Sequence, residues 1–258
     1  MKNNPLFLAL IALVTLTTSC KNDEEIPTDC TGIHWEYDGI DGPIHWSQLC
    51  TGYSTCGSTA QSPINIQNAT ADATLTAIQM TYKPSATHIL FNGHTEYFAY
   101  DTLSPSTITY GGMTYTLLQF HTHTQSEHRV SGAAYPMEIH LVHQNAATGK
   151  LAVVGLLVSE GAENATLQKF VPYLPVKKDS TYNASSTYNA SSLLPAPTGY
   201  YTYTGSLTTP PCSETVTWLV MKTPITASIA QIQAFKNVEG ENNRPVQSLN
   251  SRTLKAFN

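Results

Sequence analysis

The sequence has little charge, and no part of it is strongly basic. Only 12% of its 258 residues are charged, and 13 Lys and Arg stand against 18 Asp and Glu, which gives a formal net charge of -5. The basic residues are spread thinly, so they form no patch or stripe of the kind that binds phosphate backbones. Nucleic acid is therefore not expected as a partner.

Long apolar runs and closely spaced cysteine pairs are also missing. The longest apolar run, from Leu6 to Leu16, is too short to span a bilayer. No Cys-x-x-Cys motif occurs, so no thiolate pair of that kind competes for a metal ion. Because 41% of the residues are hydrophobic, the chain can bury a full core, and we expect one large globular domain, or at most two.

The N-terminal residues predict export. One Lys, the apolar run and small residues precede Cys20, as in a secretory signal. The segment resembles a bacterial lipoprotein signal, in which the cysteine becomes the lipidated first residue, although Thr17 stands where a leucine is usual. We expect a signal peptide at 1–19, a lipid anchor and flexible tether at 20–32, and an outer-membrane lipoprotein on the periplasmic or cell-surface side. An ordinary cleaved signal peptide with a stray cysteine is the alternative.

Cysteine usage agrees with an oxidising compartment. Five cysteines are an odd number for an exported protein, but a lipidated Cys20 leaves an even set of Cys30, Cys50, Cys56 and Cys212. Four cysteines allow three pairings, and spacing alone does not choose among them.

Most of the remaining chain predicts strands. Short stretches rich in Thr, Tyr, Val and Ile are broken by Gly, Pro, Asn and Ser, and the strongest strand patterns lie at 114–123, 136–144, 150–160 and 215–225. The turn sequence NAATG between the second and third predicts an antiparallel hairpin. Short helices are expected at 162–171 and 227–237, so the fold class is mainly β with a few peripheral helices. The repeated STYNAS at 180–185 and 186–191 predicts an exposed loop.

Histidines alternate along two of these strands. Residues two apart in a strand face the same side, so His121 and His123 project together, and His140 can join them if its strand is a neighbour. Gln119 and Glu138 each precede a candidate ligand by two residues, as groups that fix imidazole tautomers would. Three imidazoles suit Zn2+ and leave its fourth position for water, the pattern of a catalytic site. The alternative is that these are half-buried strand histidines.

A cupin-type metal oxygenase is a rival interpretation. HTHTQSE matches the His-x-His-x3-Glu core of cupins, with Glu127 as a fourth ligand. Cupins require glycine where this chain has Tyr115 and Glu138, so this remains a minor alternative.

Several stretches together resemble an α-class carbonic anhydrase. They cover the chain from residue 34 onward and read, in order, HWEYDG, GPIHW, QSPINI, NGH, QFHTH, SEH, MEIHLVH, LAVVG, GSLTTPPCSETVTWLV and NNRPVQ. The resemblance implies a catalytic domain at 33–258, built on a large twisted, mostly antiparallel mixed sheet. It also implies reversible hydration of CO2 to bicarbonate and a proton through a zinc-bound hydroxide. Carbonic anhydrases are themselves the usual example of zinc lowering the pKa of a bound water, to about 7.

The same resemblance assigns roles to single residues. His121, His123 and His140 correspond to the zinc ligands, Thr208 to the threonine that contacts the hydroxide, and Glu127 to the carboxylate that receives that threonine's proton. Thr209 corresponds to a bicarbonate contact. The residues that resemble the wall of the CO2 pocket, each of which could otherwise be ordinary core, are Val142, Val153, Leu207, Val216 and Trp218.

Proton release has its own candidates. His94 in FNGH corresponds to the family's proton shuttle, with a solvated loop histidine as the alternative, and Tyr37 to a residue of the ordered-water network. His128 points away from the site by alternation, so a structural role is expected for it.

The resemblance further implies a disulfide between Cys56 and Cys212, which leaves Cys30 and Cys50 for each other. CO2 and bicarbonate are the implied substrates, and the sequence leaves open whether the chain forms a homodimer. A non-catalytic binding or adhesion module on the same fold is the main alternative function, although all three ligands, Glu127 and Thr208 are present.

Overall fold

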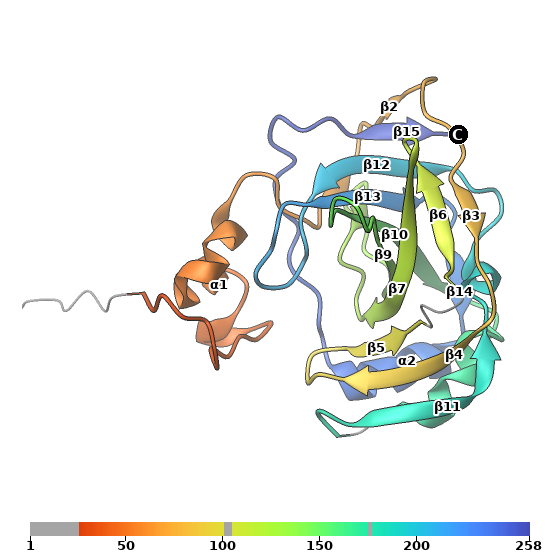
Figure 1. The fold of residues 1–258 in the computed structure, drawn as a ribbon, viewed down its shortest axis with the longest axis horizontal. Coiled ribbons are helices and arrows are strands. Elements are labelled where there is room, and N and C mark those ends of the chain that lie inside the picture. The colour runs from red at the N-terminus through yellow and green to blue at the C-terminus, as the bar shows by residue number, and fades with distance from the viewer. Residues whose placement is uncertain (1–25, 101–104, 175–176) are drawn as a thin grey trace, which may run out of the picture.

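The computed structural model describes residues 26–100, 105–174 and 177–258, in which thirteen strands join into one large sheet (Figure 1). Along its main path the strand order is β11-β4-β5-β7-β9-β10-β13-β12-β15-β2. β6 pairs with β7, β3 with β6 and β14 with β10, while β1 and β8 form a separate pair.

The strands of the described part are β1 (Asn65–Ile66), β2 (Thr70–Ala71), β3 (Gln79–Thr81), β4 (Ser85–Phe91), β5 (Glu96–Ala99), β6 (Thr107–Tyr110), β7 (Met113–His123), β8 (Arg129–Val130), β9 (Met137–Gln144), β10 (Leu151–Glu160), β11 (Thr181–Tyr188), β12 (Tyr200–Gly205), β13 (Val216–Met221), β14 (Ile225–Ala227) and β15 (Lys255–Phe257). The helices are α1 (Trp46–Leu49) and α2 (Ile229–Glu239), and the 3-10 turns are η1 (Gly39–Asp41), η2 (Thr51–Gly57), η3 (Leu167–Lys169), η4 (Val171–Tyr173) and η5 (Ala190–Leu193).

The central strands β9 and β10 are buried on both faces. Their side chains alternate between two apolar clusters: Leu141 and Val154 belong to the larger core, whereas Val142 and Val153 belong to a smaller cluster on the opposite face. Because both faces are covered, these strands read as nearly continuous apolar runs, as buried strands do. The smaller cluster packs beside the histidines described below.

The predicted strands and hairpin are confirmed. β9, β10 and β13 fall within their expected ranges, β7 begins one residue earlier than expected, at Met113, and β9 and β10 pair antiparallel across the NAATG turn. The last strand is shorter than expected because β13 ends at Met221, and the chain resumes as β14, which pairs with β10 in parallel. Pro224 lies in this gap and cannot donate a backbone hydrogen bond to a ladder.

One of the two predicted helices is wrong. α2 forms with a capping box between Ser228 and Gln231. Residues 162–171 instead form the 3-10 turn η3 and the start of η4. The side chain of Asn164 accepts hydrogen bonds from the backbone of Thr166 and Leu167, an arrangement that competes with α-helix formation, and Pro172 follows.

The STYNAS repeat is not a loop. Most of its residues form β11, which pairs antiparallel with β4 and carries an irregularity between Ala184 and Thr187, before the turn η5. β11 lies at the end of the main strand path, and Thr181, Asn183 and Thr187 are exposed there, in agreement with the polar composition of the repeat.

The N-terminal segment lies to one side of the sheet and is held by disulfides (Figure 1). Trp46 on α1 is buried with Cys56 and Cys212, which form one disulfide, and Cys30 and Cys50 form the second. Across the ranges that the structure describes, none of the helices has the length and apolar character needed to cross a membrane. Cys20 and the proposed signal peptide lie outside the described residues.

Candidate metal centre

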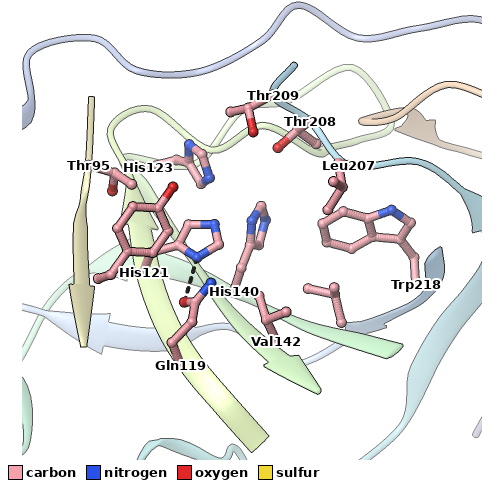
Figure 2. Close-up of a pocket in the computed structure, with 12 residues that line it drawn as sticks. Thr95, Gln119, His121, His123, His140, Val142, Leu207, Thr208, Thr209 and Trp218 are labelled. Atoms are coloured by element: carbon pink, nitrogen blue, oxygen red, sulfur yellow. Dashed lines mark hydrogen bonds between the residues drawn. The ribbon is translucent and has the colours of Figure 1, made fainter. Parts of the chain in front are cut away.

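Two neighbouring strands bring three histidines together on one face of the sheet. β7 and β9 pair antiparallel with His121 opposite His140, and His123 lies two residues further along β7. The ring centroid of His121 lies 5.1 Å from that of His123 and 5.2 Å from that of His140, and the remaining pair is 4.6 Å apart. One nitrogen of each ring lies within 4.8 Å of the other two, and the rings converge in Figure 2. The strand of His140 is thus the neighbour of the strand that carries His121 and His123, as the three-histidine site requires.

A bulge precedes the first histidine. Leu117 pairs with His143 but Gln119 pairs with Val142, so the register shifts by one residue within β7. Bulges bend a strand and change the direction of the side chains that follow, and they are common beside functional sites. The histidine pair therefore begins directly after the point where β7 bends.

Each ring has one nitrogen held by a fixed acceptor. Nδ1 of His121 lies 2.9 Å from Oε1 of Gln119, Nδ1 of His123 lies 2.7 Å from the backbone oxygen of Asn242, and Nε2 of His140 lies 2.9 Å from Oε1 of Glu138. These contacts place the proton on the bonded nitrogen and leave the other one as a lone-pair donor.

The remaining nitrogens fit a metal ion. Nε2 of His123 is buried and, within the described ranges, has no hydrogen-bond partner. A buried polar atom without a partner is costly in a folded protein, and a bound cation would remove that cost. Three imidazole nitrogens with one open side are the ligand set of catalytic zinc sites, so the residues present fit zinc.

Glu138 joins His140 to a second buried histidine. Its Oε1 also lies 2.7 Å from Nδ1 of His128, and its Oε2 accepts a hydrogen bond from the His128 backbone at 2.8 Å. Nε2 of His128 lies 2.7 Å from the hydroxyl of Tyr203. Burial raises the pKa of Glu138, but the charges and hydrogen bonds of His128 and His140 together hold it well below its usual range. His128, Glu138 and His140 are thus bonded to one another, in agreement with a structural role for His128.

Burial favours neutral imidazoles at the centre. It is the largest cause that lowers the pKa of His121 well below its ordinary value, and the charges of His123 and His140 lower it further. Burial also lowers the pKa of His123, although the charge of Glu127 acts in the opposite direction. Neutral imidazole is the protonation state that binds a metal.

A cavity of about 190 Å³ opens over the histidines, with one polar and one apolar side (Figure 2). Besides the three histidines, the predicted site residues that line it are Gln119, Val142, Val153, Leu207, Thr208, Thr209 and Trp218. Val216 does not line the cavity. It is buried in the same apolar cluster as Val153 and Trp218, and it supports the wall from behind.

Glu127 is buried and is not among the residues that line the cavity. Its Oε1 accepts a hydrogen bond from the Arg244 backbone at 2.9 Å, whereas its Oε2 has no hydrogen-bond partner in the described part of the chain. Oε2 lies 3.6 Å from Nε2 of His123. The predicted contact of Glu127 with the Thr208 hydroxyl stays a prediction.

His94 and Tyr37 lie outside the cavity lining. The ring of His94 stacks on Trp35 with centroids 3.8 Å apart and an interplanar angle of 11°. Tyr37 packs edge-on against Trp35, and burial, then the charge of Glu127, raises the pKa of its hydroxyl well above the ordinary value. Tyr37 therefore remains a neutral phenol.

Three residues of the centre have no clear signal in the sequence. Thr95 and Tyr97 line the cavity from β5 and the turn before it, and Asn242 holds His123 from a loop after α2. Tyr97 could have been found only from the strand order, because it pairs with His121 across β5 and β7. Asn242 begins the NNRPVQ stretch of the family resemblance, but no local pattern connects it with His123, which lies 119 residues away.

Comparisons with known proteins give one consistent family. The sequence profile described as eukaryotic-type carbonic anhydrase matches residues 41–258. The chain is similar to a carbonic anhydrase of Klebsiella pneumoniae, with 41% identity over 231 residues, which are 89% of this chain and 93% of the relative. It is also similar to the structure of a hyperthermostable carbonic anhydrase from an active hydrothermal vent chimney, with 40% identity, a TM-score of 0.83, and coverage of 87% of this chain and 100% of that one. The α-carbonic anhydrase of Thermovibrio ammonificans, solved with the inhibitor sulfanilamide, shares 38% identity at a TM-score of 0.83, covering 87% of this chain and 99% of that one.

Proposed function

The chain belongs to the eukaryotic-type carbonic anhydrase family, and we propose that it catalyses the reversible hydration of CO2 to bicarbonate and a proton, with zinc held by His121, His123 and His140. The observation that carries the proposal is the convergence of three imidazoles, each fixed by its own acceptor, on one open cavity. Family membership also makes the cupin-type oxygenase interpretation wrong.

The three histidines and their acceptors define the metal site. Zinc, when bound, supplies Lewis-acid activation of a water molecule near neutral pH. Gln119, Glu138 and the backbone of Asn242 fix ring orientation, because each holds the nitrogen opposite the ligating one.

Thr208 orients the nucleophile, and Glu127 orients Thr208. The free Oε2 of Glu127 is the acceptor for the Thr208 hydroxyl proton, and Oε1 is already occupied by the Arg244 backbone. A hydroxyl whose proton is committed in this way offers only lone pairs to the cavity, so it accepts a hydrogen bond from the nucleophile and directs the nucleophile's own lone pair at the carbon.

The apolar side of the cavity holds CO2. The molecule has no net dipole, so it gains from contact with Val142, Val153, Leu207 and Trp218 rather than with water. The backbone N–H of Thr208 donates a hydrogen bond to a substrate oxygen as negative charge develops on that oxygen. Thr209 contacts bicarbonate before its release. His94 accepts the released proton, and Tyr37 orders water between the cavity and His94.

CO2 hydration by stopped flow with a pH indicator tests this function. Wild-type protein should hydrate CO2 rapidly, lose that activity when a chelator removes zinc, and regain it when zinc is added back. Sulfanilamide, the inhibitor bound by the Thermovibrio ammonificans relative, should block the restored activity. No hydration by a folded, zinc-loaded protein would contradict the proposal and favour the non-catalytic binding module.

The two disulfides indicate an oxidising compartment outside the cytoplasm. We infer more specifically that residues 1–19 are a signal peptide, that Cys20 carries lipid at the outer membrane, and that residues 20–32 tether the catalytic domain of 33–258. The apolar run before Cys20 and the charged, Pro-containing residues after it support this inference. Mass spectrometry of the native N-terminus should find a lipid-modified Cys20; an unmodified Cys20 in the mature protein would rule out the anchor.

A further inference from the structure

The N-terminal segment holds the ring of His94. His94 lies in the turn between β4 and β5, where its backbone N–H donates to Oδ1 of Asn92 at 2.9 Å and its carbonyl accepts from Asn242 at 3.2 Å. Its ring stacks on Trp35 and only 11% of its side chain is exposed. The ring is therefore positioned by a segment that is distant in sequence from the metal centre.

A carboxylate stands between this ring and a second histidine. Oε2 of Glu36 lies 3.9 Å from Nδ1 of His94, and Oε1 of the same carboxylate lies 2.6 Å from Nε2 of His34. Nδ1 of His94 is buried and, in the part of the chain that the structure describes, has no hydrogen-bond partner. Glu36 is thus the acidic group that faces the unpartnered nitrogen.

Exposure increases along this row of three side chains. The exposed fraction is 11% for His94, 45% for Glu36 and 57% for His34. The ring centroids of His34 and His94 are 6.2 Å apart, and both rings lie near the carboxylate of Glu36. The row extends from the inner histidine to bulk solvent.

The electrostatic balance at His94 depends on this carboxylate. Burial is the largest influence on the pKa of His94 and lowers it, and the charges of Lys178 and His34 lower it further. The negative charge of Glu36 acts in the opposite direction. Tyr37, which packs against the same ring, is a neutral phenol and supplies no charge.

We propose that Glu36 is a positioning residue for proton release, whose carboxylate, fixed by His34, holds the protonated ring of His94 at the solvent side of the site. The proposal deepens the function above and rests on the role of His94 as proton carrier. Neutral His94 accepts a proton from water of the site at one ring nitrogen, and the imidazolium, whose charge Glu36 stabilises, then gives the same proton to a base in solvent. The N–H bond that forms is the one that breaks, so the ring returns to its starting neutral tautomer.

Isotope exchange between CO2 and water separates the two halves of the reaction on the full-length, zinc-loaded protein. It gives the rate of CO2–bicarbonate interconversion and, independently, the rate of labelled-water release, which requires proton transfer. Glu36→Gln keeps the shape of the side chain but removes its charge. We expect unchanged interconversion, proton transfer slower by roughly threefold to tenfold in weak buffer, and a pH midpoint of proton transfer lower by roughly half a unit to one unit.

Three further variants make the result specific. Glu36→Asp should shift the pH midpoint less than Glu36→Gln does, because it keeps the negative charge. His34→Ala should slow proton transfer less than Glu36→Gln does, because the carboxylate remains but is held less firmly. Asp38→Asn, which removes an exposed carboxylate from the same segment, should change neither rate. A role of Glu36 in folding alone would leave the pH midpoint unchanged.

A double variant ties the effect to His94. In a His94→Ala background, Glu36→Gln should cause no further loss. The proposal is overturned if Glu36→Gln leaves the pH midpoint unchanged, or if it slows proton transfer equally in the two backgrounds. If His94→Ala alone leaves proton transfer unchanged, both the shuttle role and this proposal fail, whereas absence of interconversion in the wild type would contradict the carbonic anhydrase function itself.

Discussion

At the scale of single residues, the centre depends on acceptors that use one nitrogen of each histidine. Glu138 makes the most of these contacts, because its carboxylate accepts hydrogen bonds from two side-chain nitrogens and one backbone N–H. The ring of His140 also packs edge-on against Trp218 at 4.8 Å, which limits its rotation. The orientation of the three histidines therefore comes from groups outside the ligand set that we propose.

Glu138→Gln should weaken zinc binding by about 10-fold to 100-fold, the usual effect of losing such a partner. An amide offers one acceptor oxygen where three donors converge, and its NH2 group would face at least one of them. Competition with a zinc-sensitive chelating dye measures the affinity. Glu160→Gln, at an exposed position on β10, is the matched control, and an unchanged affinity in Glu138→Gln would contradict the orienting role.

At the scale of elements, the end of α2 contacts the strands that carry the ligands. Oε1 of Glu239 accepts hydrogen bonds from the hydroxyls of Thr95 at 2.9 Å and Thr122 at 2.6 Å. Thr122 lies between the two histidines of β7, so α2 supports that strand from the face opposite the cavity. Burial, then the neighbouring carboxyl group of Glu96, raises the pKa of Glu239 well above its ordinary value.

This pKa shift predicts a pH-dependent stability. The unfolded chain ionises Glu239 near the ordinary value of about 4.3, whereas the folded protein keeps the proton to higher pH. The contribution of this group to stability is therefore complete below the ordinary pKa and is lost as pH rises through the folded pKa. Glu239→Gln, which imitates the protonated group, should flatten the decline of the melting temperature as pH rises above the ordinary pKa of a glutamate.

Thermal unfolding across that pH range measures the effect. The exposed Glu163→Gln serves as control and should follow the wild-type curve. Parallel curves for wild type and Glu239→Gln would show that the carboxyl group of Glu239 does not titrate in the folded protein over this range.

At the scale of the whole molecule, one disulfide joins the N-terminal segment to the loop that lines the cavity. Cys56 and Cys212 are separated by 156 residues, and Cys212 follows the loop that carries Thr208 and Thr209. The guanidinium of Arg244 donates to the backbone oxygen of Cys56 at 2.9 Å, which adds a second link at the same place. The Cys56–Cys212 disulfide therefore contributes both to the stability of the fold and to the position of the loop that carries Thr208 and Thr209.

Replacing both Cys56 and Cys212 by Ser should cost more stability than replacing Cys30 and Cys50. In the chain-entropy model, the longer loop corresponds to about 5 kcal/mol and the 20-residue separation of the second pair to about 3 kcal/mol. Denaturant unfolding measures both losses, and CO2 hydration should fall only in the first variant. Equal losses would mean that loop length does not determine the contribution of these bonds.

Local sequence patterns were enough to predict the features that depend on a few neighbouring residues. Alternation placed His121 and His123 on one face, and the NAATG turn paired β9 with β10, because strand periodicity and turn chemistry act over a few residues. The helix expected at 162–171 failed because its local signal competed with the capping of the backbone by Asn164.

Features that depend on packing between distant segments became visible only in the folded chain. Spacing alone left three pairings for four cysteines, and the fold brings Cys212 to Cys56, as the family resemblance implied. The acceptor of His123 comes from Asn242 on a loop after α2. The placement of Glu36 beside His94 has the same origin. Such contacts follow from how the sheet and its flanking segments pack as a whole, and no local periodicity encodes them.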